Sequence, residues 1–262
     1  MIARREFLLV CAAAAASAKE TVRRVKVETV FKSPGPQPNG LQATADGLWI
    51  LDQKDNRAYL VDYERGKVLR ALETDSKAGS GITFDGEAIW IASTYSREII
   101  RSDAKTGKTL AKYASPGSGA VAWTNGRRSP LAPPPPPAAP AAAPPASRQP
   151  TGAHGLEWKN GRLWISVPPA QKIYRLNPAG FQIEHEFATA GDRPHGLGWE
   201  GDSLWCVDSN LNAMVRHDVK TGKWSERIQL ADSDPLPHGM TIWKGTVWYC
   251  DDVGVVCRFP LR

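Results

Sequence analysis

The 262-residue sequence predicts an all-β protein, a β-propeller of five four-stranded blades. Five apolar runs begin with a glycine, and a tryptophan follows each glycine nine residues later, in the pairs Gly40 and Trp49, Gly81 and Trp90, Gly155 and Trp164, Gly196 and Trp205, and Gly239 and Trp248. The glycines are 41, 74, 41 and 43 residues apart. A four-stranded unit of about 40 residues, repeated in register, is typical of propeller blades.

Each copy reads as four short strands joined by turns. In the third copy the expected strands are residues 154–158, 163–166, 173–176 and 183–187. The dipeptide Asn160-Gly161 between the first two strands favours a tight hairpin turn, because both residues tolerate positive φ. We expect the recurring tryptophan to pack between neighbouring blades as a large apolar side chain.

The last copy has only three strands before the chain ends at Arg262. Residues 26–31, followed by the tripeptide 38–40, align with residues 183–187 followed by 194–196. The first strand of the mature chain is therefore predicted to complete the last blade. This pairing would close the ring and remove two open sheet edges.

The long interval contains an insertion at residues 118–152 that is rich in proline and alanine. Proline lacks a backbone donor and favours polyproline II, so this tract cannot form central strands. We expect a surface loop within one propeller domain of residues 25–262. Six blades with one degenerate member remain an alternative, because residues 120–123 could form a strand.

Residues 1–18 resemble a signal peptide. Arg4 and Arg5 precede an apolar run, and Ala16-Ser17-Ala18 matches a small-residue cleavage site. The pattern resembles the twin-arginine (Tat) motif, with a generic secretion signal as the alternative. No other segment is long and apolar enough to span a membrane. We predict a periplasmic or secreted protein. The net charge is +6 without a basic run in the body of the chain, which argues against a nucleic-acid partner.

Removal of the signal peptide would leave Cys206, Cys250 and Cys257. An odd number of cysteines fits no closed disulfide framework, and no Cys-x-x-Cys spacing indicates a zinc knuckle. Cys250 and Cys257 flank a short turn, so the sequence leaves a disulfide between them open.

Polar residues recur where the propeller channel should open. The first strand of a blade lines the channel, and the residues before the five glycines are Asn39, Ser80, His154, His195 and His238. The residues after the second strands are Asp52, Ser93, Val167, Asp208 and Asp251, with Asp252 next. Both sets should gather at one channel mouth, whereas His185 and His217 are expected on the surface.

This set suggests two kinds of chemistry. Histidine titrates near neutral pH, so His154, His195 and His238 are candidate catalytic acids or bases. Neutral imidazole with carboxylate also suits a divalent metal ion, for which the candidate ligands are the three histidines with Asp208 and Asp251. The two aspartates could instead accept hydrogen bonds from the imidazoles and so orient them. The alternative is structural, with His-Gly merely capping a loop in each blade.

The segment from Pro194-His195-Gly196-Leu197 to Leu204-Trp205 resembles the repeat of the virginiamycin B (streptogramin) lyase family. Those propellers open a cyclic depsipeptide by metal-assisted elimination, with histidines at the channel mouth as acid and base. The resemblance implies these roles for His195 and His238. Five blades instead of the family's seven put the ligand size and the catalytic geometry in doubt.

A second resemblance is to the five-bladed glutaminyl cyclases. Residues 91–95, leading to Arg101, Asp103 and Thr106-Gly107-Lys108, look like one of their blades, although Ser80 stands where an acidic residue is expected. A non-enzymatic binding propeller is the third alternative. In each case we expect a monomer with a small-molecule or peptide ligand at the channel mouth.

Overall fold

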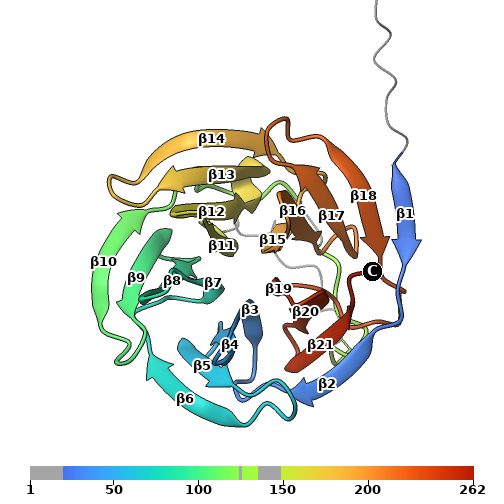
Figure 1. Cartoon of the computed structure of the whole chain (residues 1–262), viewed down its shortest axis with the longest axis horizontal. Coiled ribbons are helices and arrows are strands. Elements are labelled where there is room, and N and C mark those ends of the chain that lie inside the picture. The colour runs from blue at the N-terminus through green and yellow to red at the C-terminus, as the bar shows by residue number, and fades with distance from the viewer. Residues whose placement is uncertain (1–19, 124–125, 135–148) are drawn as a thin grey trace, which may run out of the picture.

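The computed structural model describes residues 20–123, 126–134 and 149–262, and these form a ring of five blades around one axis (Figure 1). The predicted signal peptide lies outside the described residues. The fold prediction is confirmed, with five blades of four antiparallel strands each. The described part of the insertion contributes no strand of a sixth blade.

In the first three blades the strands run outward from the axis in sequence order. The first blade contains β3 (Pro38–Thr44), β4 (Gly47–Asp52), β5 (Arg57–Val61) and β6 (Val68–Glu73). The second contains β7 (Gly79–Phe84), β8 (Ala88–Ser93), β9 (Glu98–Asp103) and β10 (Thr109–Ala114). The third contains β11 (Gly155–Lys159), β12 (Arg162–Val167), β13 (Lys172–Asn177) and β14 (Gln182–Ala188), with a 3₁₀ turn at Pro168–Ala170.

The last two blades take up the N-terminal strands. The fourth contains β15 (Pro194–Glu200), β16 (Ser203–Asp208), β17 (Ala213–Asp218), β18 (Trp224–Gln229) and, at its outer edge, β1 (Thr21–Arg24). The fifth contains β19 (Met240–Trp243), β20 (Thr246–Asp251), β21 (Val255–Pro260) and β2 (Glu28–Lys32). The hairpin turn of the third blade also agrees with the prediction, because Asn160 and Gly161 have φ of 51° and 71°.

The recurring tryptophans lie between the blades, as predicted. Each is at most 5% exposed and packs into a core that its own blade shares with the next one. Trp90 of β8, for example, clusters with Leu156 and Leu163 of the third blade. Trp248 of β20 closes the series against Leu48 of the first blade. Five equivalent interfaces of this kind bury the apolar faces of all five sheets.

The recurring glycines allow the innermost strands to touch. A Cβ on Gly81 would lie 2.8 Å from the carbonyl oxygen of His154, and one on Gly239 would lie 2.6 Å from that of Asn39. Both obstacles are backbone atoms of the neighbouring blade, so no side-chain rotation could relieve them. With only five blades the inner strands pack backbone against backbone, and this close approach requires glycine.

The ring closes through β2, as the sequence predicts. Glu28 to Lys32 pair with Arg258 to Val255 of β21, and the side chain of Phe31 is buried against the first and fifth blades. The sequence did not reveal β1, which pairs in parallel with β18 of the fourth blade. The N-terminal segment thus joins the fourth blade to the fifth, and Arg23 Nη2 donates to the carbonyl oxygen of Leu261 at 2.6 Å.

This double attachment should be essential for stability. A chain that begins at Ser33 lacks β1 and β2, and its melting temperature should be well below that of a chain that begins at Glu20. In the shorter chain β21 has lost its partner strand, and the loss of Phe31 leaves a cavity in the core. Thermal unfolding followed by circular dichroism measures the difference. Equal melting temperatures for the two chains would contradict this account of ring closure.

The insertion was expected to be a surface loop, but its described part is bound to the ring by hydrogen bonds. Gly119 and Thr151 pair at its base in an antiparallel bridge. Beyond this bridge, the backbone N–H of Arg127 donates to Asn210 Oδ1 at 3.0 Å, and Ser129 Oγ donates to Asp251 Oδ2 at 2.5 Å. The described part of the insertion therefore packs on loops of the fourth and fifth blades.

The structure also bears on the cysteines and on the expected lack of a membrane-spanning segment. Cys206, Cys250 and Cys257 are buried free thiols, so the alternative of a disulfide between Cys250 and Cys257 is wrong. Within the described ranges, no helix has the length and apolar character needed to cross a membrane.

Glu157 of β11 is a carboxyl group buried close to the axis. Its oxygens accept hydrogen bonds from Thr241 Oγ1 at 3.4 Å and from the Trp158 backbone N–H at 3.1 Å. Burial raises the pKa of Glu157 from 4.5 to about 8, so the folded protein holds this group in the neutral form at pH 7.

This shift predicts a pH-dependent stability. Between about pH 4.5 and pH 8 only the unfolded state ionises Glu157. The contribution of Glu157 to the free energy of unfolding therefore falls as the pH rises, by up to roughly 5 kcal/mol. Glu157→Gln cannot ionise and should gain stability relative to the wild type across this window. Denaturant unfolding of both proteins at pH 5 and pH 8.5 measures this difference in the free energy of unfolding. A constant difference between the two proteins would contradict the prediction.

Candidate functional site

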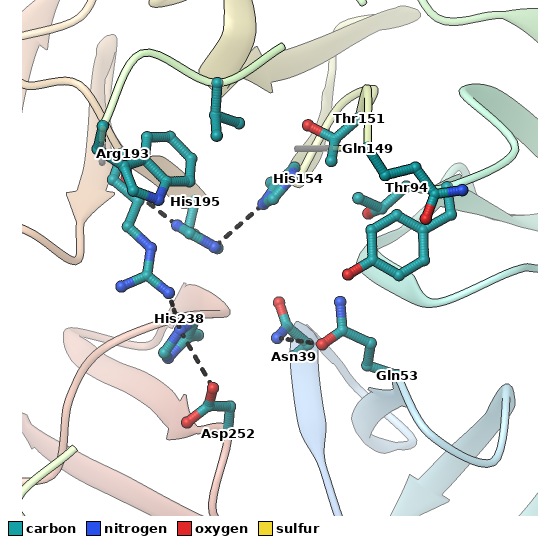
Figure 2. Close-up of a pocket in the computed structure, with 13 residues that line it drawn as sticks. Asn39, Gln53, Thr94, Gln149, Thr151, His154, Arg193, His195, His238 and Asp252 are labelled. Atoms are coloured by element: carbon teal, nitrogen blue, oxygen red, sulfur yellow. Dashed lines mark hydrogen bonds and ion pairs between the residues drawn. The ribbon is translucent and has the colours of Figure 1, made fainter. Parts of the chain in front are cut away.

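Three imidazoles meet at one mouth of the channel, at the entry to the innermost strands of three consecutive blades (Figure 2). His154 Nδ1 and His195 Nε2 are 3.1 Å apart. The ring centroids of His154 and His195, and those of His195 and His238, are separated by 4.8 Å. The equivalent sequence positions predicted this convergence, because each histidine precedes a repeat glycine that faces the axis.

The histidines line a cavity of about 310 Å³. Figure 2 shows Arg193, His195, His238 and Asp252 along one side, and Asn39, Gln53 and Thr94 on the other. Among the described residues, the lining consists of Asn39, Gln53, Thr94, Tyr95, Val121, Trp123, Gln149, Thr151, His154, Arg193, His195, His238 and Asp252. A concave site of this size suits a small ligand.

Backbone carbonyl groups determine which nitrogen of each imidazole carries the proton. His195 Nδ1 faces the carbonyl oxygen of Arg193 at 3.1 Å, and His238 Nδ1 faces that of Leu236 at 3.4 Å. A carbonyl oxygen can only accept, so Nδ1 is the protonated nitrogen in both rings. In the neutral form their Nε2 atoms therefore present lone pairs.

The same reasoning extends to His154. Since His195 Nε2 is an acceptor, His154 Nδ1 must donate to it. His154 Nε2 then carries a lone pair, and this atom is buried without a hydrogen-bond partner. All three rings thus share one tautomer, with basic Nε2 atoms.

Burial keeps the imidazoles neutral. Desolvation lowers the pKa of His154 to about 3 and that of His238 to about 4, and it holds the pKa of His195 well below its ordinary value. The positive charge of Arg193 is a second cause of these low pKa values in all three rings. The negative charge of Asp252, whose Oδ2 is 3.6 Å from His238 Nε2, instead raises the pKa of His238. At neutral pH the three side chains are bases, not cations.

The aspartates that follow the second strands connect two loops. Asp52, Asp208 and Asp251 each accept a hydrogen bond from the loop that enters the first strand, from the backbone N–H of Gln37 at 2.5 Å, Arg193 at 2.9 Å and Leu236 at 2.7 Å. Their other oxygens accept from the turn after the second strand, from the N–H of Lys54, Leu211 and Val253. Asp208 therefore supports the loop that carries Arg193 and His195.

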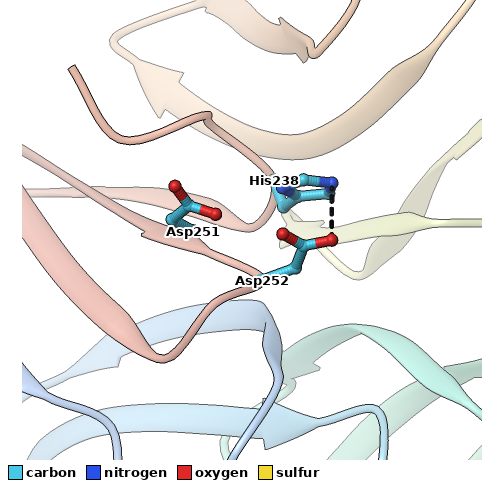
Figure 3. A group of neighbouring side chains, drawn as sticks. All are labelled: His238, Asp251 and Asp252. Atoms are coloured by element: carbon cyan, nitrogen blue, oxygen red, sulfur yellow. Dashed lines mark ion pairs between the residues drawn. The ribbon is translucent and has the colours of Figure 1, made fainter. Parts of the chain in front are cut away.

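One group of side chains has the donors for a metal ion. His238, Asp251 and Asp252 each offer a ligand atom, and these atoms lie within 4.8 Å of one another (Figure 3). This group contains two of the predicted ligands, His238 and Asp251, together with Asp252. The other two predicted histidine ligands, His154 and His195, form a hydrogen bond with each other. An imidazole lone pair with two carboxylates suits a divalent cation. Burial raises the pKa of Asp251 to about 7, and Ser129 Oγ and the Leu236 N–H bind its Oδ2.

Arg193 is the residue that sequence reasoning missed. Its Nη1 donates to the carbonyl oxygen of Arg127 at 2.8 Å, and its guanidinium carbon lies 5.7 Å from the centre of the Trp123 ring. Its Nη2 lies 3.4 Å from His238 Nε2. Arg193 directly precedes Pro194-His195, but no basic residue recurs at this place in the other blades, so the repeat pattern did not distinguish it.

The remaining two histidines lie outside the site. His185 is half-buried on β14. His217 of β17 is 1% exposed, its ring centroid lies 5.5 Å from that of Phe187, and its Nδ1 donates to the carbonyl oxygen of Gly222. The expectation that His217 is a surface residue is wrong, because it packs under the outer strands.

Comparisons with known proteins support the fold. No protein-family model and no curated protein matches the chain. Among solved structures, glutaminyl cyclase from Myxococcus xanthus matches with a TM-score of 0.65 at 10% identity, over 92% of this chain and 97% of that one. A streptogramin B lyase matches with a TM-score of 0.51 at 16% identity, over 90% and 98% of the two chains.

A third structure holds a ligand. A catalytically inactive histidine-to-alanine variant of virginiamycin B lyase from Staphylococcus aureus, with quinupristin, matches with a TM-score of 0.50 at 21% identity. The match covers 86% of this chain and 66% of that one. Both resemblances noted in the sequence are thus confirmed at the level of the fold.

Proposed function

We propose that this protein is an exported, lyase-like enzyme that acts on a small or cyclic peptide-like ligand at the channel mouth. One observation carries the proposal: three consecutive blades each place a neutral imidazole at a single cavity, where Nε2 of His195 accepts from His154 and Nε2 of His238 faces Arg193 and Asp252. A neutral imidazole can remove a proton from a ligand and return it to a leaving group.

The contacts favour different roles for the three rings. His238 lies between Arg193 and Asp252, so the carboxylate would stabilise its imidazolium once it has taken a proton. His195 is oriented by the Arg193 carbonyl and receives a hydrogen bond from His154. We assign His238 as the base. His195 can act as the second acid/base group only when a ligand displaces His154 Nδ1 from its Nε2, because that hydrogen bond occupies the lone pair.

A divalent ion would fit His238, Asp251 and Asp252 by donor type. When bound, it would polarise a carbonyl oxygen of the ligand and so acidify the adjacent C–H bond. Asp251 would offer mainly Oδ1, since Oδ2 already accepts two hydrogen bonds. His238 would then serve as a ligand of the ion, and His195 could act as the base only after a ligand displaces His154 Nδ1 from its Nε2.

The ion can be tested without a substrate. Calorimetric titration of the chelator-treated protein with Mn²⁺ should give one site, and Asp252→Asn should weaken it at least about tenfold through the loss of one carboxylate. Asp46→Asn, on an exposed turn, is the matched control and should bind as the wild type does. Unchanged affinity in the Asp252 variant would rule out this group as the metal site.

The reaction itself is tested with quinupristin, the ligand of the structurally similar lyase. Elimination opens the ring without a change of mass, whereas hydrolysis adds one water. Liquid chromatography with mass spectrometry should show a product of unchanged mass and altered retention. An intact ligand after prolonged incubation, with and without Mn²⁺, would count against lyase activity on this class of compound.

The second candidate is a glutaminyl cyclase-like enzyme. The size and blade number favour it, since the similarity to the Myxococcus xanthus enzyme spans nearly the whole of both chains. Cyclisation of an N-terminal glutamine releases ammonia, so a glutaminyl peptide incubated with the protein provides the assay. If neither compound reacts, the non-enzymatic binding propeller is the function to retain.

A further inference from the structure

The charges on the cavity wall are few and opposite in sign. Among the described residues that line it, Arg193 is the only arginine or lysine and Asp252 is the only carboxylate. Within the described part of the chain, Arg193 is therefore the fixed cation that a ligand meets in this cavity.

Several contacts hold this cation in place. Asp208 binds the backbone N–H of Arg193, and the carbonyl of Arg127 binds Nη1. The Trp123 ring lies against the guanidinium at 5.7 Å. Arg127 is anchored in turn by Asn210 and by its ion pair with Asp232 at 2.6 Å. The insertion thus positions Arg193, which lowers the entropy that ligand binding would cost.

The opposite side of the cavity is polar but uncharged. Asn39, Gln53 and Thr94 offer amide and hydroxyl groups there (Figure 2). Such groups pair with the N–H and C=O groups of peptide bonds. The cavity volume of about 310 Å³ is at the small end of ligand sites and suits a molecule of about dipeptide size.

We propose that Arg193 binds a carboxylate, so that the ligand is a short peptide-like molecule with a free carboxyl group. The planar guanidinium matches a carboxylate with two parallel N–H donors. His238 separates this subsite from Asp252, with Nε2 at 3.4 Å from Arg193 and 3.6 Å from Asp252. This inference rests on the proposed ligand site but not on the proposed reaction, and it favours an acyclic ligand over a closed ring.

A pair of probes that differ only in charge tests the proposal. N-Acetyl-glycylphenylalanine and its C-terminal amide are titrated by calorimetry at pH 7 and low salt. The acid should bind at least about tenfold more tightly than the amide, since a charge-assisted hydrogen bond contributes more than a neutral one. Arg193→Gln should remove this preference, and Arg193→Lys should retain part of it.

Arg162→Gln is the matched control, because Arg162 lies at an exposed ion pair with Glu184 outside the cavity. It should keep the full preference, and all variants should keep the wild-type circular dichroism spectrum. Equal affinity for the two probes, no binding of either, or a preference that survives in Arg193→Gln would overturn the proposal. If the protein prefers the acid but leaves quinupristin intact, that result would count against lyase activity on cyclic ligands of this class, and the present inference would stand.

Discussion

Gly40→Ala is expected to destabilise the propeller by about 3 kcal/mol or more, or to prevent folding. The new Cβ would lie 2.5 Å from the carbonyl oxygen of Ser80 and 2.9 Å from the backbone nitrogen of Ile82. Both atoms belong to the innermost strand of the next blade, which neighbouring strands hold on both sides. Overpacking that only a backbone shift can relieve is among the costlier single changes.

Thermal and denaturant unfolding measure this effect. For a domain of this size, 3 kcal/mol corresponds to a fall of roughly 6–12 °C in melting temperature. Gly119→Ala is the matched control, since its Cβ would meet only Pro169 at an ordinary 3.7 Å. A Gly40 variant as stable as the Gly119 variant would show that the inner strands do not require glycine.

His238→Gln should have the largest effect on function. If His238 acts as the base or holds the ion, its loss should lower the rate of ring opening by about 10²–10⁴. Folding should persist, because the glutamine amide fits the space of the ring and its polar end can still meet Arg193. His185→Gln, a half-buried histidine on β14 far from the mouth, is the control and should keep the wild-type rate.

The combined result separates the roles of His238. A loss of rate with unchanged Mn²⁺ affinity would identify His238 as an acid or base. A loss of both would identify it as a metal ligand. A full rate in His238→Gln would refute the assignment of this ring to either role.

The features that repeat were predictable from the sequence. The fixed spacing of Gly40 and Trp49 recurs because each blade meets the same two demands, close approach at the axis and a large apolar side chain between sheets. The same register placed His154, His195 and His238 at one mouth. Periodicity therefore predicted the ring, its closure by β2 and the convergence of the imidazoles.

The features that do not repeat were not predictable. Arg193 and Trp123 have no counterparts in the other blades, and their contact depends on how the insertion crosses the mouth. Strand β1, which pairs in parallel with β18, has only four residues. So short a segment does not show the alternation of apolar and polar residues by which a strand is recognised in a sequence. The role of Asp208 was ambiguous because a carboxylate at a strand end can face a ligand or accept from nearby backbone N–H groups, and the structure shows the second.

The central claim is that the channel mouth holds three neutral imidazoles whose Nε2 atoms are bases. Long-range ¹H–¹⁵N correlation spectra of the chelator-treated protein at pH 7 test it directly, because they report which nitrogens of each ring carry a proton. We predict that His154, His195 and His238 are each protonated only at Nδ1, as their hydrogen bonds require. A doubly protonated ring, or an Nε2–H tautomer at His195 or His238, would contradict the account.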